Sequence, residues 1–229
     1  MERARRRLGT VADRLLDLAL PAACVGCGRE GDPFCARCRP ALDVRRDAAP
    51  GIPIGLPSDV PAPLLQLEWC APFSGPVREA LHALKYAGER RLEQRLGIAV
   101  AACWRDAGAG GDLVVHVPVH RDRARERGFD QADRIAMVAA GRLGLEHVAV
   151  LERSRATTAQ FRLDRRHRAA NVAGAFRLVD PSLRNMVHGR WPILVDDVVT
   201  TGSTLVACAE VLLEAGAIGV SAVTVARER

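Results

Sequence analysis

Lysine is almost absent from this chain of 229 residues, because Lys85 is the only one. A P-loop nucleotidase needs a Gly-Lys-Ser/Thr triplet to hold its phosphates. No such triplet occurs in the sequence, so that class of protein is excluded. A pyridoxal cofactor, which forms a Schiff base with lysine, would have only Lys85 to use.

Aromatic residues and long apolar runs are also scarce. Aromatic side chains make up 4% of the residues, so nucleic-acid binding by base stacking has little support. No run of 18 apolar residues exists, so we expect no membrane span. Residues 1–24 begin with basic residues and continue into an apolar stretch, as signal peptides do. Because Asp13, Arg14 and Asp17 interrupt that stretch, we expect an amphipathic helix and a cytoplasmic protein.

The formal charge of +6 is unevenly spread. Residues 121–168 hold 12 Arg against 7 Asp and Glu, which accounts for +5 of the total. Such an excess attracts polyanions, either a phosphorylated metabolite or nucleic acid. A solvated, Arg-rich helical surface explains any single arginine equally well. If single-stranded DNA binds here, the candidate contacts are Arg123, Arg125 and Arg127.

Two Cys-x-x-Cys pairs lie near the N-terminus, at Cys24, Cys27, Cys35 and Cys38. A zinc ion takes four soft ligands in a tetrahedron, and two such pairs can supply them. Disulfides and a redox pair are the alternatives. Disulfides are rare in the cytoplasm, and a redox motif of the thioredoxin type would lie on a βαβ unit. The pattern therefore predicts a structural zinc site.

Three regions follow from the pattern along the chain. Residues 1–46 form an N-terminal helix and the four-cysteine head. Residues 47–65 form a linker, because residues 47–64 contain five prolines and two glycines. Residues 66–229 alternate apolar strands with helices, which predicts an α/β domain with a parallel sheet flanked by helices. Because of the linker, we expect the head to unfold separately from the domain.

The expected elements of the domain are short. Apolar patterns predict strands at 64–73, 112–119, 147–151, 192–196 and 219–226. Helices are expected within 75–107, with a break near Gly88, and at 129–143 and 202–215.

The segment "PILVDDVVTTGSTL" (192–205) ends a buried strand with Asp196 and Asp197. Ligands of open α/β sheets bind at the carboxyl ends of strands. The following turn supplies backbone N–H groups, hydroxyls and the positive end of a helix, which together predict a monophosphate cradle. Its residues are Thr200, Thr201, Gly202, Ser203 and Thr204. The carboxylates would hold ribose hydroxyls, and Mg²⁺ could bridge to a diphosphate. An ordinary capping loop is the alternative, but two buried aspartates without partners are costly.

This segment resembles the signature of type I phosphoribosyltransferases that binds 5-phosphoribosyl pyrophosphate (PRPP). The four-cysteine head, "LKYAGE" (84–89), "VPVHRDRARERGFDQA" (117–132), "TTAQFRLDRRHRAANVAGAF" (157–176) and the PRPP loop occur in an order similar to the ComF family. The resemblance covers nearly the whole chain. One departure is Asp130, where the family usually has Asn. An ionised Asp cannot donate a hydrogen bond, which puts any ligand contact of that Asn in doubt.

The resemblance implies a type I phosphoribosyltransferase fold with a zinc finger at its N-terminus. The turn Val117–Arg121 would bind pyrophosphate, with Val119, His120 and Arg121 as candidates. A hood over the site would contain Gln160, Arg162, Arg168 and Asn171. The activity implied is transfer of phosphoribose from PRPP, with Mg²⁺ and with Asp196 and Asp197 as the catalytic residues, linked to DNA uptake and its proteins. Two alternatives remain: a non-catalytic module that binds single-stranded DNA during competence, and a regulator that senses PRPP.

Overall fold

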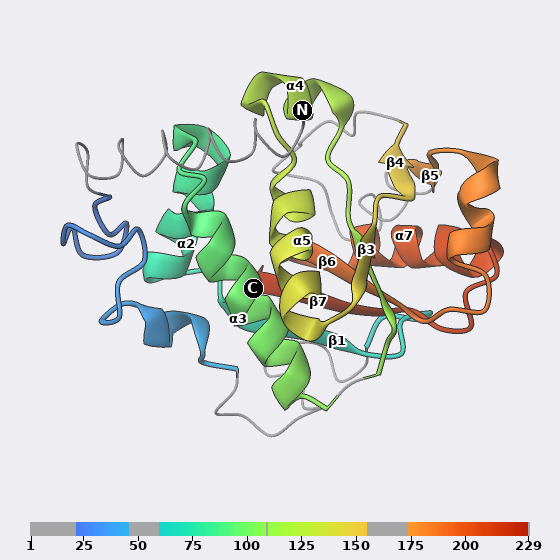
Figure 1. Ribbon diagram of the computed structural model, residues 1–229, viewed down its shortest axis with the longest axis horizontal. Helices are drawn as coiled ribbons and strands as arrows, with labels where there is room; N and C mark the ends of the chain where they lie inside the picture. Colours follow the sequence, from blue (N-terminus) through green and yellow to red (C-terminus); the bar gives the residue numbers. More distant parts are fainter. Residues whose placement is uncertain (1–21, 46–59, 109, 155–173, 229) are drawn as a thin grey trace, which may run out of the picture.

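A parallel sheet of five strands forms the centre of the computed structural model, which describes residues 22–45, 60–108, 110–154 and 174–228. The strand order is β1-β7-β6-β2-β3, and every neighbouring pair is parallel. The strands are β1 (Leu67–Pro72), β2 (Leu113–His116), β3 (Glu146–Val148), β6 (Pro192–Val199) and β7 (Ser221–Arg227). The expected fold class, a parallel sheet flanked by helices, is confirmed (Figure 1).

The sheet is covered on both faces. Every residue of β2 and β7 is buried, as strands of a sheet with two covered faces must be. Helices α2 (Gly75–His82), α3 (Leu92–Asp106) and α5 (Gln131–Leu143) cover one face, and α7 (Ser203–Glu214) covers the other. Gly97 of α3 lets that helix approach α5 closely, because an added Cβ there would lie 2.5 Å from Val138.

Two parts of the domain differ from the expectation. The single strand expected at 147–151 is divided between β3 and β4 (Leu151–Arg153), and β4 pairs antiparallel with β5 (Phe176–Leu178) in a separate small sheet. A short helix that the pattern did not predict, α4 (Arg121–Arg127), lies beyond the end of β2. It has no buried residue, so no apolar periodicity marks it in the sequence.

Most of the other expected elements are present. The break near Gly88 is confirmed: α2 runs into a π-helical turn, η2 (Ala83–Ala87), and Gly88 ends it with a φ of +66°. Two 3-10 turns, η1 (Arg39–Leu42) and η3 (Pro181–Met186), complete the described elements. Among the described helices, none is long and apolar enough to cross a membrane.

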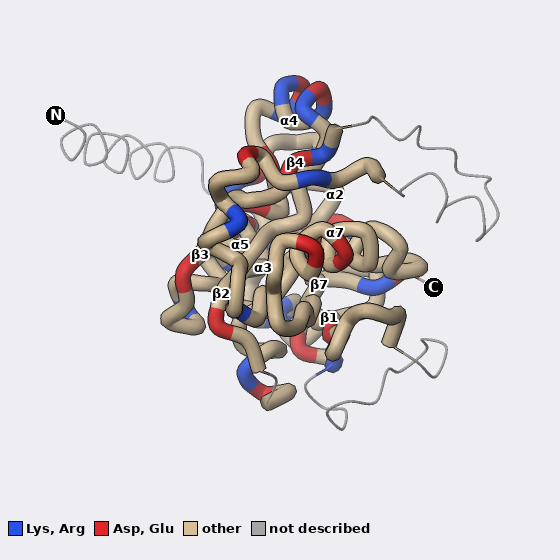
Figure 2. Tube along the Cα trace, turned by 90° about the vertical axis from the view of Figure 1, so that its right-hand side faces the viewer, with Lys and Arg blue, Asp and Glu red and all other residues tan. Residues whose placement is uncertain are grey.

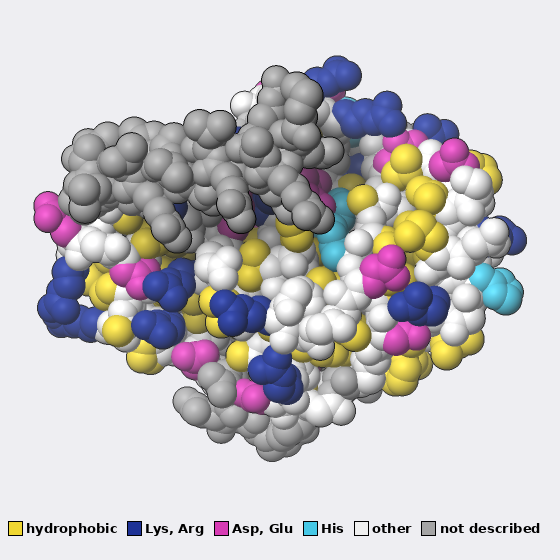
Figure 3. All heavy atoms as spheres, in the orientation of Figure 1, with side chains coloured by type: hydrophobic (Ala, Val, Ile, Leu, Met, Phe, Trp, Pro, Cys, Tyr) yellow, Lys and Arg dark blue, Asp and Glu magenta, His cyan; other side chains and the backbone are white. Residues whose placement is uncertain are grey.

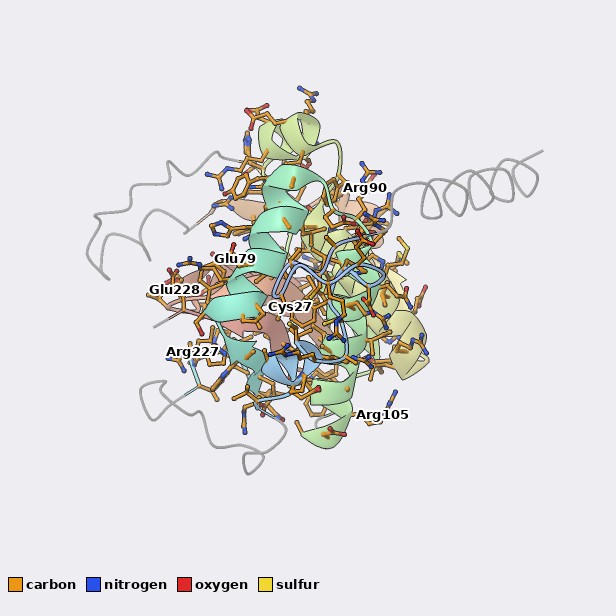
Figure 4. All side chains as sticks on the ribbon, turned by 90° about the vertical axis from the view of Figure 1, so that its left-hand side faces the viewer. Cys27, Glu79, Arg90, Arg105, Arg227 and Glu228 are labelled. Carbon is orange, nitrogen blue, oxygen red and sulfur yellow. The ribbon has the colours of Figure 1, made fainter. Side chains whose placement is uncertain are left out.

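The cysteine-rich head packs directly on the domain, against α2 and α3 (Figure 4, where Cys27 is labelled). Phe34 and Leu42 are fully buried in the same apolar core as residues of those two helices. Asp32 forms an ion pair of 2.6 Å with Arg95 of α3. These contacts argue against a head that unfolds alone. The division at 1–46, 47–65 and 66–229 stays a prediction.

Candidate functional site

The second half of the central strand β6 holds the acidic pair, because the strand expected at 192–196 continues to Val199 before a tight turn. Residues 200–202 form the turn, and α7 begins at Ser203. Gly202 has a φ of +81°, and an added Cβ would meet the ring of Pro61 at 3.0 Å. The hydroxyls of Thr201 and Ser203 lie 2.9 Å apart. The predicted strand, turn and helix are therefore present, and Thr200 is exposed at the turn.

Asp197 is buried and already has a cationic partner. Its Oδ2 lies 2.7 Å from Lys85 Nζ, and the same oxygen accepts a hydrogen bond of 3.0 Å from Gln131 Nε2. The side chains of Lys85 and Asp197 are 17% and 9% exposed. Lys85 comes from the π-helical turn η2, and such turns are frequent at functional sites. The segment "LKYAGE" by itself indicates no partner for its lysine, which meets Asp197 only in the fold.

Asp196 is in a different position, because it is partly exposed and its neighbour carries the same charge. Burial raises the pKa of Asp196 well above its ordinary value, and the Asp197 carboxylate adds to the rise. The Asp197 N–H donates a hydrogen bond of 2.8 Å to Asp196 Oδ1, which partly opposes this rise in pKa. Burial lowers the pKa of Arg153 of β4, and the negative charge of Asp196 acts to raise it. Ionised Asp196 is thus unfavourable unless a cation approaches it.

Asp130, which stands where the resemblance leads us to expect Asn, accepts hydrogen bonds from two parts of the backbone. It caps α5, where Oδ1 accepts a hydrogen bond of 2.9 Å from the Ala132 N–H. Its Oδ2 accepts another of 2.9 Å from the Val119 N–H, in the expected pyrophosphate turn. The two contacts use both carboxylate oxygens as acceptors. Asn has one acceptor oxygen and an NH₂ group that only donates, so Asp fits this pair of N–H donors better than Asn does. The Val119 N–H is thereby engaged within the protein.

The other two residues expected in that turn begin α4. His120 is its N-cap, and Nδ1 accepts a hydrogen bond of 3.3 Å from the Asp122 N–H. Arg121 donates to Glu152 of β4, which Arg177 of β5 also contacts at 2.7 Å. Burial acts to raise the pKa of Glu152, but hydrogen bonds from the two arginines outweigh it and the pKa is lowered. The Arg121–Glu152 pair ties α4 to the small sheet, and the Arg177–Glu152 pair joins the two strands of that sheet.

The three arginines proposed as DNA contacts fall into two groups. Arg127 donates a hydrogen bond of 3.0 Å to Gln131 Oε1, so it belongs to the network of the acidic pair. Arg123 and Arg125 are exposed on α4, which Figure 2 shows as a cluster of mixed charge. Basic side chains stand out at the upper edge of the face in Figure 3, where α4 lies. The hood candidates Gln160, Arg162, Arg168 and Asn171 lie outside the described residues.

The four cysteines come together in the head, with ligand atoms all within 4.8 Å of one another. The Sγ atoms of Cys27 and Cys35 lie 3.5 Å apart. That distance is far longer than a disulfide bond of about 2.05 Å and close to the edge of about 3.8 Å of a tetrahedron with Zn–S bonds of ~2.3 Å. In both pairs the second Cys N–H donates to the carbonyl of the first, at 3.3 Å and 2.9 Å. The predicted cluster is therefore able to hold a metal ion.

The thiols of the cluster also have the electrostatics of a metal site. Burial raises the pKa of Cys38 to about 12, and hydrogen bonds with the neighbouring thiols contribute. Burial also acts to raise the pKa of Cys24, but backbone N–H groups, first that of Cys35, outweigh it and bring the pKa to about 6. One thiolate therefore forms readily, whereas four together need a cation to neutralise them.

Sequence comparisons relate the chain to proteins named for the use of DNA. No family model matches it. It is 33% identical over 175 residues to the DNA utilization protein YhgH of Escherichia coli strain K12, covering 74% of this chain and 75% of that protein. It is 34% identical over 201 residues to YhgH of Salmonella typhi, covering 80% and 86%. Competence protein F of Haemophilus influenzae is 27% identical over 147 residues, covering 62% and 63%.

Solved structures are similar only at a distance. The glutamine PRPP amidotransferase from B. subtilis, complexed with ADP and GMP, has a TM-score of 0.40 and 22% identity, covering 58% of this chain and 26% of that enzyme. A hypothetical protein from Neisseria gonorrhoeae with bound ppGpp has a TM-score of 0.35 and 16% identity, covering 69% and 70%. Likeness at this level carries no argument about function.

Proposed function

Because this chain belongs to the ComF family, with the YhgH proteins and competence protein F among its relatives, we propose that it binds PRPP and has the type I phosphoribosyltransferase fold that the family implies. One observation carries the proposal. The acidic pair lies toward the carboxyl end of the central parallel strand, and residues 200–202 turn from that strand into α7, which begins at Ser203. Ligands of open α/β sheets bind at that end of the strands.

The geometry supports a division of roles within the site. The turn and the first N–H groups of α7 would hold the 5-phosphate, because the start of a helix favours anions. Asp196, which is more exposed than Asp197, would face the ribose hydroxyls and Mg²⁺. Asp197 is held by Lys85 and Gln131, so it would fix the end of β6 rather than move with the ligand.

Transfer, where it occurs, displaces pyrophosphate from C1 of PRPP. A bond forms between the acceptor nucleophile and C1, the C1–O bond breaks, and pyrophosphate leaves with the electron pair. Bound Mg²⁺ would supply charge neutralisation for the leaving group. The acceptor stays undefined, and a protein that binds PRPP without transferring it would be a PRPP-sensing regulator. We place this activity in the cytoplasm, where thiols stay reduced.

Thermal stability of the full chain tests PRPP binding. A ligand present at 100 times its Kd stabilises the folded state by about 2.7 kcal/mol. We expect PRPP with Mg²⁺ to raise the melting temperature of the wild-type protein but not that of Asp196→Asn. The matched control is Glu210→Gln, which removes an exposed acid from α7 and should keep the shift. An unchanged shift in Asp196→Asn would show that the loop is assigned wrongly.

A second assay addresses transfer. Pyrophosphate release from PRPP is measured with candidate acceptors present. Release that depends on both the acceptor and Asp196 supports the enzyme. PRPP binding without release, with every acceptor tried, favours the regulator.

A second candidate function is binding of single-stranded DNA during DNA uptake. It is favoured by the names of the relatives and by the exposure of Arg123 and Arg125 on α4. With 4% aromatic residues, the contacts would go to phosphates, so affinity should fall with salt with a log–log slope of about −0.7 per phosphate neutralised. Partners among the DNA-uptake proteins would follow from this function.

Fluorescence anisotropy of a labelled oligonucleotide measures that slope. We expect Arg123→Ala/Arg125→Ala to flatten the slope and to leave PRPP binding unchanged. The control, Arg29→Ala/Arg184→Ala, removes two exposed arginines elsewhere and should leave the slope as it is. Absence of binding at low salt, with the PRPP response intact, would remove this candidate.

A further inference from the structure

Two histidines and an aspartate meet near the edge of the parallel sheet. His116 is the last residue of β2, His147 lies on the neighbouring edge strand β3, and Asp133 lies in the first turn of α5. His147 pairs with Val114 in the ladder. Since side chains alternate along a strand, His116 and His147 point to the same face, the one that α5 covers.

The three ligand atoms face one another at short distances. His116 Nδ1 lies 3.2 Å from His147 Nε2 and 3.6 Å from Asp133 Oδ1. His147 Nε2 lies 3.7 Å from the same Asp133 oxygen. A triangle with these sides has a circumradius of about 2.0 Å, which equals the usual Zn–N and Zn–O bond lengths of ~2.0–2.2 Å. An ion close to the plane of the three atoms can thus reach all of them without movement of the chain.

We propose that His116, Asp133 and His147 form a second metal site, for a divalent transition-metal ion such as zinc. Two imidazoles and one carboxylate suit zinc and its neighbours in the first transition row better than Mg²⁺ or Ca²⁺. The histidine side chains are 8% and 13% exposed, whereas that of Asp133 is 28% exposed. A further position on the ion would therefore open toward solvent beside Asp133.

The position of the site suggests what the ion would do. β3 has three residues, and among the described strands it pairs only with β2. The ion would join β3 to β2 and to the start of α5, whose cap Asp130 holds the expected pyrophosphate turn through the Val119 N–H. It would stabilise this edge of the sheet, and the inference does not depend on PRPP binding.

Metal analysis of the full chain tests the proposal. The protein is stripped with a chelator under reducing conditions, reloaded with zinc at neutral pH and dialysed, and zinc per chain is measured. We expect two equivalents for the wild type. His147→Asn and Asp133→Asn should each retain one, with affinity for the second ion weakened by more than about 100-fold, since even outer-shell changes weaken metal sites by ~10–100-fold. Cys24→Ser should also retain only one equivalent, held at the histidine site.

Two controls make the result decisive. His188→Asn removes an exposed histidine outside the cluster and should keep both equivalents. Zinc retained by the four cysteines of the variants, together with an unchanged circular dichroism spectrum, shows that they are folded. One equivalent in the wild type, or two in both His147→Asn and Asp133→Asn, would overturn the proposal, whatever the outcome of the PRPP experiment.

Discussion

Replacing Lys85 with Met should destabilise the fold through the charge it leaves behind on Asp197. At 2.7 Å, the two charges attract by about 6 kcal/mol at an effective dielectric constant of ~20, before the cost of dehydration is subtracted. Removing one partner of a buried pair costs about 3–5 kcal/mol. Lys85 is still 17% exposed, and Gln131 still donates to the carboxylate. We therefore expect a loss of about 2–3 kcal/mol in the free energy of unfolding.

A double-mutant cycle separates this charge effect from the loss of packing. Asp197→Asn keeps the shape of the side chain, and the double variant with Lys85→Met leaves no charge without its partner. We expect the double variant to be about as stable as the less damaged single variant. The coupling energy then equals the larger single loss, which is at least about 2–3 kcal/mol. If two residues lie near each other without interacting, the stability losses of the two single variants add up in the double variant.

Urea unfolding followed by circular dichroism at neutral pH measures the cycle. The matched control is Arg78→Met, which breaks the exposed pair with Glu79, where the side chains are 56% and 51% exposed. Such surface pairs contribute about 0–1 kcal/mol. A coupling energy below about 0.5 kcal/mol, or a loss in Lys85→Met no larger than in Arg78→Met, would refute the assignment of Lys85 as the partner that holds Asp197.

Three further predictions concern the acidic strand end, the small sheet and the head. Asp196→Asn should raise the free energy of unfolding at neutral pH, because the folded-state pKa of Asp196 is raised. The gain should shrink as the pH falls toward about 3.9, the ordinary aspartate value. A gain that grows in acid would contradict this. Glu152→Gln should lower the free energy of unfolding at neutral pH. The loss should disappear in acid as the pH falls through the lowered pKa of Glu152. Unfolding measured at a series of pH values checks the Asp196 and Glu152 predictions. Cys24→Ser should release the metal of the head and speed amide exchange in α2 and α3, because Phe34 lies in their core; unchanged protection there would show that the head is dispensable.

The central sheet was predictable because its evidence is local. Strands buried on both faces need continuous apolar runs, and such runs mark β2, β6 and β7 in the sequence. The acidic pair and the turn after it are likewise contiguous from Asp196 to Thr204. Their position at the carboxyl end of a parallel strand follows from the fold class alone.

The partners of the site were not predictable from the pattern, since they come from distant parts of the chain. Lys85 reaches Asp197 from a π-helical turn that no periodicity indicates. The segment 147–151 reads as one strand, but its two ends pair with different partners, β2 and β5. Helix α4 has no apolar face, and it is defined by His120 at its start and Gly128 at its end.

The link between α4 and the acidic pair decides how the two candidate functions can be separated. Arg127 donates to Gln131, and Gln131 donates to Asp197, so a change at Arg127 would reach the PRPP site as well as the surface of α4. A loss of DNA binding in an Arg127 variant would therefore have two explanations. Arg123 and Arg125 are exposed on the same helix, and no described hydrogen bond or ion pair joins either side chain to Asp197. A pair of substitutions there changes the basic surface without removing a hydrogen bond of Asp197. Because Arg123 also lowers the pKa of Arg153, on which the charge of Asp196 acts, PRPP binding has to be measured on the same variant.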